Sequence, residues 1–468
     1  MIASPNNSTL TGSASSSSES GLLDQSALSD LAQRLVEAAR RAGADAADAV
    51  AVRGVSQGVE VRDGRVEESE RSEGDDVGLR VLVGKRQAVV STNDIGGDGI
   101  AKLAERAVAM ARVAPDDDYV GLADPALLAR DFPDLDLLDP SMPSTAELER
   151  RALEAEAAGL AVKGVTKSGG ASASSGIGGM VLVTSTGFHG AYLRSSHGLS
   201  MTAISGEGTG MERDYDFSSA LHAADLASPE SIGRSAGARA VARANPRKAE
   251  TCKAPVIFDP RVAGSLVGHL VGAANGASIA RKTSFLKDRL GQQLFASGIR
   301  IIDDPRRVRG LRSQVFDAEG VATKRLAIIE DGVLTSWLLD SATARELGMT
   351  TTGHAHRGVS SSPMPGAYNL HMEAGEVTPA ELIADIKQGF YVTDLIGSGV
   401  NGVTGDYSRG ASGFWIENGK LSYAVSEMTI AGHLLEMFKS LRPANDLAFR
   451  YGVNAPTLRI EGLTIAGR

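Results

Sequence analysis

Three two-residue turn signals constrain the fold of this chain more than its other local patterns do. Asp63-Gly64, Asp331-Gly332 and Asn418-Gly419 each lie between two segments that read as β-strands. Asp-Gly and Asn-Gly accept positive φ at both central positions of a tight turn, which a two-residue hairpin requires. Both halves of the chain are therefore expected to contain antiparallel sheet.

Helical patterns flank the strand-rich stretches of the first half. Apolar residues recur at helical spacing over residues 26–41, 100–114, 145–162 and 228–245. Helices beside a meander of strands predict an α+β layer in which the helices cover one face of an antiparallel sheet. In the third of these helices, Ser144 or Thr145 is the expected N-cap.

The second half is richer in strands and is expected to form a β-barrel-like domain with a few helices. Helices are expected over 262–278, near residue 345 and over 378–389, and the tail APTLRIEGLTIAG is expected to supply a strand pair. The overall prediction is an α+β protein with three parts: a disordered Ser-rich tail at 1–22, an N-terminal α+β domain at 23–248 and a C-terminal β-rich domain at 249–468.

Composition restricts the partners and the compartment. The net charge of -9 over 468 residues disfavours nucleic acid, because nonspecific binding needs clustered Lys and Arg to release counterions. The only cysteine, Cys252, has no partner for an internal disulfide. The first residues have no basic region and no apolar core typical of a secretory signal. A cytoplasmic location is expected.

The segment from Val262 to Ala280 is uncharged for 19 residues, long enough to span a bilayer. It contains four Gly, two Ser, one Asn and one His, which is too polar for a membrane helix. Its glycines recur at every fourth residue, so they form a strip without side chains that another helix or strand can approach. Such contact would offset the roughly 1 kcal/mol that each glycine costs a helix. The glycines are Gly264, Gly268, Gly272 and Gly276.

Residues of catalytic type are sparse. His269 is the only histidine in the glycine-rich helix, and one imidazole does not hold a catalytic zinc, so a histidine packed in a helix interface is the simpler interpretation. His354 and His356 would share one face of a strand, but no third ligand lies nearby until Glu373. No nucleophile elbow or phosphate-binding loop is evident.

The second half resembles the TldD/PmbA family, formerly called modulators of DNA gyrase, and its PmbA (TldE) branch in particular. The resemblance extends over roughly residues 25–468 and is strongest after about residue 254. It is carried by VIFDPRVAGSLVGHLVGAANGASIARKTSFL, LFASGIRIIDDP, RGLRSQVFDAEGVATKRLAIIEDGVLTSWLLDSATARELG, SGVNGVTGDYSRGASGFWIENGKLSYAVSEMTIAG and APTLRIEGLTIAG.

In the TldD branch the matching helix carries an H-E-x-x-x-H motif and a later acidic residue, which build a zinc peptidase site. This pattern places its first histidine on Gly264, its glutamate on Ser265, its second histidine on His269 and the acidic residue on Gly272. Only the histidine at 269 is present, and the zinc-binding cysteine near the C-terminus of TldD-type chains has no counterpart. The resemblance therefore implies that this chain binds no zinc and has no catalytic residues.

The resemblance further implies a cytosolic heterodimer in which a TldD-type partner holds the zinc and cuts unfolded peptides or peptide precursors. This chain would complete the access cavity, and strand addition would hold an extended peptide. The glycines of LIGSGVNGVTGDY would let a peptide backbone pass closely. The candidate peptide-channel residues are His269, Gly402, Gly405 and Asp406.

Two alternatives remain at this point. One is a self-sufficient metal-dependent hydrolase in which folding brings His269, His354 and His356 together. The other is a regulator or adaptor that binds a topoisomerase or toxin–antitoxin component, as the family's older name suggests. Neither alternative, nor the leading one, involves nucleic acid or membrane as a direct partner.

Overall fold

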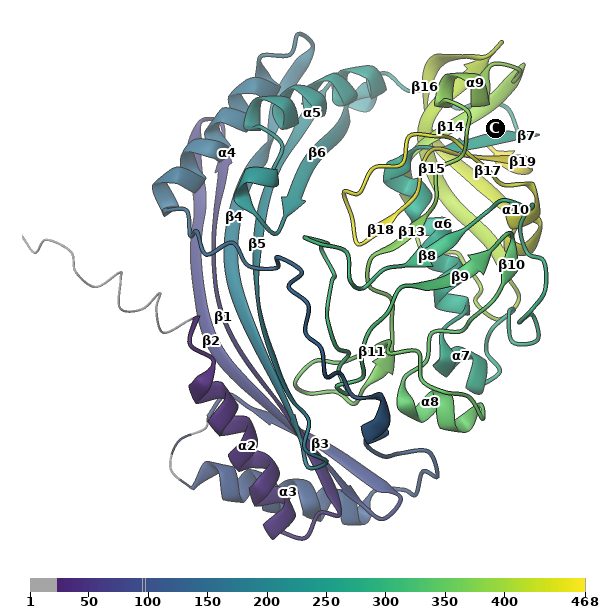
Figure 1. The fold of residues 1–468 in the computed structure, drawn as a ribbon. Coiled ribbons are helices and arrows are strands. Elements are labelled where there is room, and N and C mark those ends of the chain that lie inside the picture. The colour runs from purple at the N-terminus through teal and green to yellow at the C-terminus, as the bar shows by residue number, and fades with distance from the viewer. Residues whose placement is uncertain (1–22, 95, 97, 468) are drawn as a thin grey trace, which may run out of the picture.

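A computed structural model describes residues 23–94, 96 and 98–467 of the chain. The predicted Ser-rich tail at 1–22 lies outside these residues. The first half is built on one long, curved sheet, and the second half lies on the inner side of that curve (Figure 1). The connection between the halves runs from the end of helix α5 at Arg243 to the start of strand β7 at Cys252.

The sheet of the first half has six strands in the order β3-β2-β1-β4-β5-β6, and every neighbouring pair is antiparallel. Four of its strands are unusually long, at 17 to 20 residues, which gives the sheet its span. The strands are β1 (Ala46–Arg62), β2 (Arg65–Val83), β3 (Arg86–Thr92), β4 (Val165–Thr184), β5 (His189–Ser205) and β6 (Glu212–Ala220).

Two helix pairs cover one face of this sheet, and the second half of the chain covers part of the other. In β1, Ala49 and Ala51 are buried with the helices α2 and α3, whereas Val50 between them is buried with Phe316 of the second half. The period of two residues therefore places small residues under the helices. The predicted α+β layer is confirmed. The helices are α2 (Ser26–Arg41), α3 (Gly99–Val113), α4 (Thr145–Leu160) and α5 (Pro229–Arg243).

The second half contains a closed five-stranded barrel. Its strands follow the order β16-β15-β14-β7-β19, and pairing between β16 and β19 closes the ring. The short strand β17 (Arg442–Pro443) pairs with β19. This confirms the predicted β-barrel-like domain. The barrel strands are β7 (Cys252–Phe258), β14 (Gln388–Ile396), β15 (Asp406–Glu417), β16 (Lys420–His433) and β19 (Leu458–Ala466).

A second sheet and five short helices pack around the barrel. The sheet has the order β10-β9-β8-β13-β18, and β11 and β12 form a separate pair. These strands are β8 (Ile301–Asp303), β9 (Leu326–Glu330), β10 (Val333–Leu334), β11 (Ala355–His356), β12 (Met364–Pro365), β13 (Leu370–Met372) and β18 (Val453–Asn454). The helices are α6 (Pro260–Ala273), α7 (Gly276–Ala280), α8 (Ser341–Glu346), α9 (Pro379–Ile383) and α10 (Leu434–Ser440).

All three turn signals form the predicted hairpins. Arg62 pairs with Arg65, Glu330 with Val333, and Glu417 with Lys420. Both turn residues have positive φ in each case, at 52° and 71°, 48° and 79°, and 48° and 74° along the chain. The predicted cap at Ser144 is also present, with its Oγ accepting from the Glu147 amide at 3.2 Å.

Three local predictions for the second half were wrong in extent. The glycine-rich helix breaks at Ala274, and Asn275 caps the separate helix α7 through the Ala277 amide. Helix α9 ends at Ile383, because the barrel recruits the following residues from Gln388 into β14. The tail forms one strand, β19, with a bulge at Gly462 (φ 70°), where a strand pair was expected. Among the described helices, none is long and apolar enough to cross a membrane.

A candidate peptide-binding cavity beside helix α6

Helix α6 joins the barrel to the long sheet. It follows the buried strand β7, and the Asp259 side chain caps it by accepting from the Arg261 amide at 3.0 Å. The Arg261 guanidinium in turn donates to Asp214 of β6 at 2.7 Å, and both side chains are nearly inaccessible to solvent. Leu266 and Leu270 bury the opposite face of the helix in the barrel core. The helix is thus fixed from both halves of the molecule.

The glycine row of this segment has two different roles. A Cβ at Gly264 would lie 2.9 Å from the carbonyl oxygen of Val453, and one at Gly276 would lie 2.8 Å from that of Leu338. These two glycines permit the close backbone approach that the spacing predicts. At Gly268 and Gly272, a Cβ would meet no atom within 4 Å. The middle of the strip is therefore open, contrary to the expectation of one continuous contact surface.

The open middle of the strip forms one wall of a cavity of about 320 Å³. The opposite wall comes from the loop between β14 and β15, and the aromatic ring of Phe285 and the side chain of Arg409 complete the lining. Besides the two glycines, α6 contributes only His269 and the small side chain of Ala273 to the lining. The absence of side chains leaves room for a ligand against the helix backbone.

His269 supplies the imidazole of this cavity. Its ring packs edge-on against Tyr407, with ring centroids 6.0 Å apart, and its buried Nε2 has no hydrogen-bond partner among the described residues. Burial lowers the pKa of His269, and the positive charge of Arg409 lowers it further. The imidazole is therefore neutral at pH 7 and can accept or donate one hydrogen bond to a ligand.

The other three predicted channel residues lie in the loop between β14 and β15 or, for Asp406, at the first position of β15. Gly402 lines the cavity, and its carbonyl accepts from the Phe285 amide at 3.0 Å. Gly405 is buried at φ 90°, where a Cβ would contact the His433 ring at 3.1 Å. Asp406 is exposed, and its carboxylate accepts from the Thr404 hydroxyl at 2.6 Å. The structure thus brings His269 and Gly402 together in the cavity, whereas Gly405 and Asp406 support the loop outside the lining.

The other two candidate histidines lie in a buried polar cluster. The His354 Nε2 is 3.3 Å from the Asp303 carboxylate, and its Nδ1 is 2.9 Å from the Thr352 carbonyl. His356 packs on the same Tyr368 ring as His354. Burial lowers the pKa of His356 to about 4, with a smaller contribution from the charge of His354. The structure therefore pairs His354 with His356 around Tyr368 and places His269 in the cavity beside α6.

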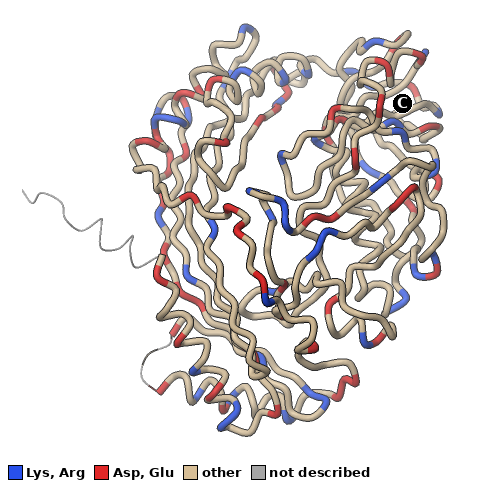
Figure 2. The backbone as a smooth tube through the Cα atoms, in the orientation of Figure 1, with Lys and Arg blue, Asp and Glu red and all other residues tan. Residues whose placement is uncertain are grey.

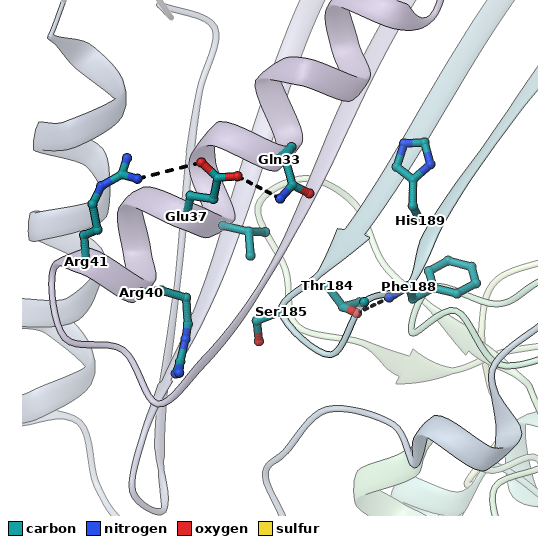
Figure 3. A pocket seen from close by; sticks show the side chains of 10 residues that line it. Gln33, Glu37, Arg40, Arg41, Thr184, Ser185, Phe188 and His189 are labelled. Carbon is teal, nitrogen blue, oxygen red and sulfur yellow. Dashed lines mark hydrogen bonds and ion pairs between the residues drawn. The ribbon is translucent and has the colours of Figure 1, made fainter.

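Another hollow, of about 430 Å³, lies between α2 and the turn that joins β4 to β5 (Figure 3). Its charged groups already bind other groups of the protein. Arg41 lies 3.7 Å from the Glu37 carboxylate, which also accepts from Gln33 at 2.9 Å, and Arg40 donates to the Ala44 carbonyl at 2.7 Å. With these groups satisfied inside the protein, the cavity beside α6 is the better candidate site.

Sequence reasoning missed Phe285, Tyr407 and Arg409. Arg409 and Tyr407 lie on β15, more than 130 positions from α6 in sequence, and no local spacing connects them with His269. The alternation along β15 would have placed Tyr407 and Arg409 on one face, but the bulges in this strand make such a prediction unsafe.

Comparisons with known proteins identify the family. Three family models match in succession: PmbA/TldA metallopeptidase domain 1 over 47–111, the central domain over 138–244 and the C-terminal domain over 251–467. Metalloprotease PmbA of Escherichia coli O157:H7 is 40% identical over 412 residues, which cover 88% of this chain and 90% of that protein. The chain belongs to the PmbA/TldD family.

Other members agree in sequence and fold. The metalloprotease PmbA homolog of Haemophilus influenzae is 37% identical over 438 residues, 92% of this chain and 94% of that protein. A putative modulator of DNA gyrase from Bacteroides thetaiotaomicron superposes with a TM-score of 0.87 at 27% identity, over 95% of this chain and 99% of that one. TldE from Thermococcus kodakarensis shares the fold, with a TM-score of 0.82 at 20% identity over 93% of this chain and 100% of that one.

The zinc implied by the family's TldD branch does not fit the residues of this helix. Gly264 stands where the first histidine would, and the Val453 carbonyl occupies the space that its Cβ would need. Ser265 donates to the Val262 carbonyl of its own helix at 2.6 Å. Over residues 23–94, 96 and 98–467, no group of three or more His, Cys, Asp or Glu side chains is placed to hold a metal ion.

Proposed function

We propose that this chain is the subunit without a zinc site in a two-subunit peptidase complex of the PmbA/TldD family. In this proposal a related TldD-type chain holds the zinc and cuts unfolded peptides or peptide precursors in the cytoplasm. This chain binds no cofactor, and its cavity beside α6 guides the extended peptide. It is a pseudoenzyme that works only as part of the complex.

The packing at Gly264 is the observation that carries this proposal. A histidine at this position would place its Cβ 2.9 Å from a backbone oxygen, so the helix would have to shift before a ligand fitted. The helix is fixed at its N-terminus by the ion pair between Arg261 and Asp214, which resists such a shift. The remaining imidazole, His269, supplies one ligand where a catalytic zinc needs three protein ligands.

The open strip beside Gly268 and Gly272 supports a role in holding peptide. Backbone groups of an extended segment can approach a helix face that lacks side chains, and the neutral His269 and the cationic Arg409 offer polar contacts there. Val403, which follows Gly402 in the adjoining loop, is 56% exposed and adds apolar surface next to the cavity. A site of this kind binds many sequences weakly and performs no chemistry by itself.

Co-purification with a TldD-type partner tests the proposal. The two chains are produced together, separated under native conditions and analysed for zinc, and an unstructured peptide is incubated with each chain and with the mixture. We expect stoichiometric zinc only in the partner and cleavage only in the mixture. Tight zinc binding and peptide cleavage by this chain alone would overturn the proposal and favour the self-sufficient hydrolase.

Filling the cavity tests its role in the mixture. Gly272→Leu places a side chain in the open space beside His269, and we expect it to reduce cleavage at limiting peptide concentration without preventing association. Gly74→Leu is the matched control, because a Cβ at Gly74 in the exposed part of β2 also meets no atom within 4 Å. Equal rates for the two variants would exclude the cavity beside α6 from the peptide path. Recovery of a topoisomerase in place of a TldD-type chain would instead support the adaptor alternative.

A further inference from the structure

An arginine-rich loop follows β8 and lies between the two halves of the molecule. It carries Arg306, Arg307, Arg309 and Arg312 within seven residues. Figure 2 shows the tip of this loop in blue, pointing from the second half toward the long sheet. The chain as a whole carries a net charge of -9, so this cluster of positive charge between its halves contrasts with the rest of the molecule.

The carboxylates near this loop neutralise only part of its positive charge. Arg309 binds both Asp136 and Asp225, and Asp304 accepts from the backbone amide of Arg306 at 3.1 Å. Within the described part of the chain, Arg306, Arg307 and Arg312 have no carboxylate at ion-pair distance.

A further arginine lies beneath the loop. Arg194 of β5 donates to the carbonyls of Leu311 and Ser313, and it also lacks a carboxylate partner among the residues described. Burial lowers the pKa of Arg194. This guanidinium therefore holds the loop through its backbone carbonyls and adds positive charge beneath it.

Arg307 is held in position without using its hydrogen-bond donors. Its guanidinium carbon lies 3.5 Å from the centroid of the Phe449 ring, a stacked arrangement. The His371 ring packs edge-on against the Phe449 ring, with the two centroids 5.0 Å apart, and supports it. No hydrogen bond or ion pair joins the Arg307 side chain to another described residue, so all five N–H donors are available.

This guanidinium faces a small polar pocket of about 210 Å³ between the halves. The lining includes Ser219 at the end of β6, Asp225 with its partner Arg309, and Tyr451 and Asn454 near β18. The Asn454 side chain is bonded to the backbone of Arg450 and Tyr451, whereas the Tyr451 hydroxyl forms no hydrogen bond to any described residue. The pocket is large enough for one carboxylate group with its neighbouring atoms and too small for a folded ligand.

We propose that this pocket binds a carboxylate of an unfolded peptide, with Arg307 as its main ligand and Arg306 and Arg312 adding to the attraction. The carboxylate is either the C-terminus of the peptide or an Asp or Glu side chain. A guanidinium binds a carboxylate through two parallel hydrogen bonds, which a stacked, preorganised arginine favours. The proposal deepens the proposed function and rests on it, since it assigns this chain a choice among peptide substrates.

Fluorescence anisotropy with labelled peptides tests this assignment on the full chain. Three unstructured peptides of the same length are compared: one with a free C-terminal carboxylate and no acidic residue, its C-terminal amide, and the amide with one internal glutamate. We expect the free carboxylate or the glutamate to strengthen binding about tenfold over the plain amide, as a charge-assisted hydrogen-bonded pair does. Which of the two peptides gains identifies the source of the carboxylate.

Variants separate the pocket from general charge. Arg307→Gln should lower the affinity for the carboxylate peptide to that for the amide, and Phe449→Leu, which removes the stacking platform, should lower it part of the way. Arg65→Gln changes the net charge equally at an exposed residue of the β1–β2 hairpin and should change nothing. Unaltered thermal unfolding of Arg307→Gln checks that the fold is intact.

Equal affinity for all three peptides, or no saturable binding of any of them at millimolar concentration, would overturn the carboxylate proposal. Zinc analysis and cleavage by the mixed subunits are independent of these measurements. The proposed function can therefore stand while the carboxylate pocket fails. A loss of selectivity in Arg65→Gln equal to that in Arg307→Gln would also reject the pocket, because it would show a nonspecific charge effect.

Discussion

Replacing single glycines of α6 by alanine should stabilise the chain at one turn of the helix and fail to stabilise it at the neighbouring turn. At Gly268 a new Cβ would meet no atom within 4 Å, so Gly268→Ala gains only helix propensity. We expect it to raise the free energy of unfolding by about 1 kcal/mol. At Gly264 the same methyl group would lie 2.9 Å from the Val453 oxygen and 3.5 Å from its carbonyl carbon.

Both substitutions gain the same helix propensity, so the difference between their free energies of unfolding measures the contact of Gly264 with β18. Overpacking of this kind costs about 1–3 kcal/mol, because a backbone carbonyl in a sheet yields less than a flexible side chain. Subtracting the gain of about 1 kcal/mol leaves Gly264→Ala between neutral and about 2 kcal/mol less stable than the unaltered chain. Gly268→Ala should therefore exceed Gly264→Ala in stability by about 1–3 kcal/mol.

Urea unfolding followed by tryptophan fluorescence measures this difference, since both tryptophans, Trp337 and Trp415, belong to the core that packs on α6. The corresponding shift in Tm is about 2–4 °C per kcal/mol for a cooperative unit of roughly 150–250 residues. Equal stabilisation of both variants would refute the close packing of β18 on Gly264. Destabilisation by Gly268→Ala would refute the open cavity wall.

Three further results follow from charges and burial. The folded pKa of His356 is lowered to about 4 from 6.5, so the unfolded chain takes up the proton first as the pH falls through this range. His356 should therefore cost the native chain up to about 3 kcal/mol of stability as the pH falls from 6.5 to 4. His356→Gln should remove this loss, which urea unfolding at several pH values measures. Parallel plots of stability against pH for the variant and the unaltered chain would contradict the prediction. Asp214→Asn leaves Arg261 and Arg243 short of a buried counterion and should cost about 3 kcal/mol. Asp118→Asn, which breaks the pair with Lys85 in which both side chains are exposed, should cost about 1 kcal/mol or less, and both values are read from urea midpoints. Partial burial raises the pKa of the Cys252 thiol, so a thiol reagent at pH 7.5 should modify the native chain more slowly than the urea-unfolded chain. Equal rates would contradict this prediction.

Local chemistry made part of the fold predictable. The turns at Asp63, Asp331 and Asn418 were predictable because Asp-Gly and Asn-Gly specify a hairpin within four residues. Helix α4 was predictable from its apolar spacing and its Ser144 cap. The end of helix α9 was not, because residues from Gln388 onward pair with β15 in the barrel, and this tertiary pairing overrides the helical pattern.

The candidate site was less accessible from the sequence, because it depends on contacts between distant segments. The spacing of the glycines identified the strip on α6, but not that Val453 covers one end and that nothing covers the middle. The register of β15 decides which side chains meet His269, and that register contains bulges after Ala411 and Phe414. The sequence therefore identified the helix, whereas the cavity is a property of the closed barrel.

Gly268 and Gly272, which no other described part of the chain covers, help to explain the unusual composition of α6. Gly264 and Gly276 are compensated by the close approach of Val453 and Leu338, so packing alone explains them. Gly268 and Gly272 have no such compensation, and each costs the helix about 1 kcal/mol relative to alanine. A cost that no contact within the chain offsets is explained if something outside the chain uses the space. The carbonyl at Gly402 and the imidazole of His269 border that space, and an extended peptide backbone is the ligand whose width and polarity suit such a wall. This is the combination that the proposed role predicts: a helix without zinc ligands and with room for a peptide that the partner subunit would cut.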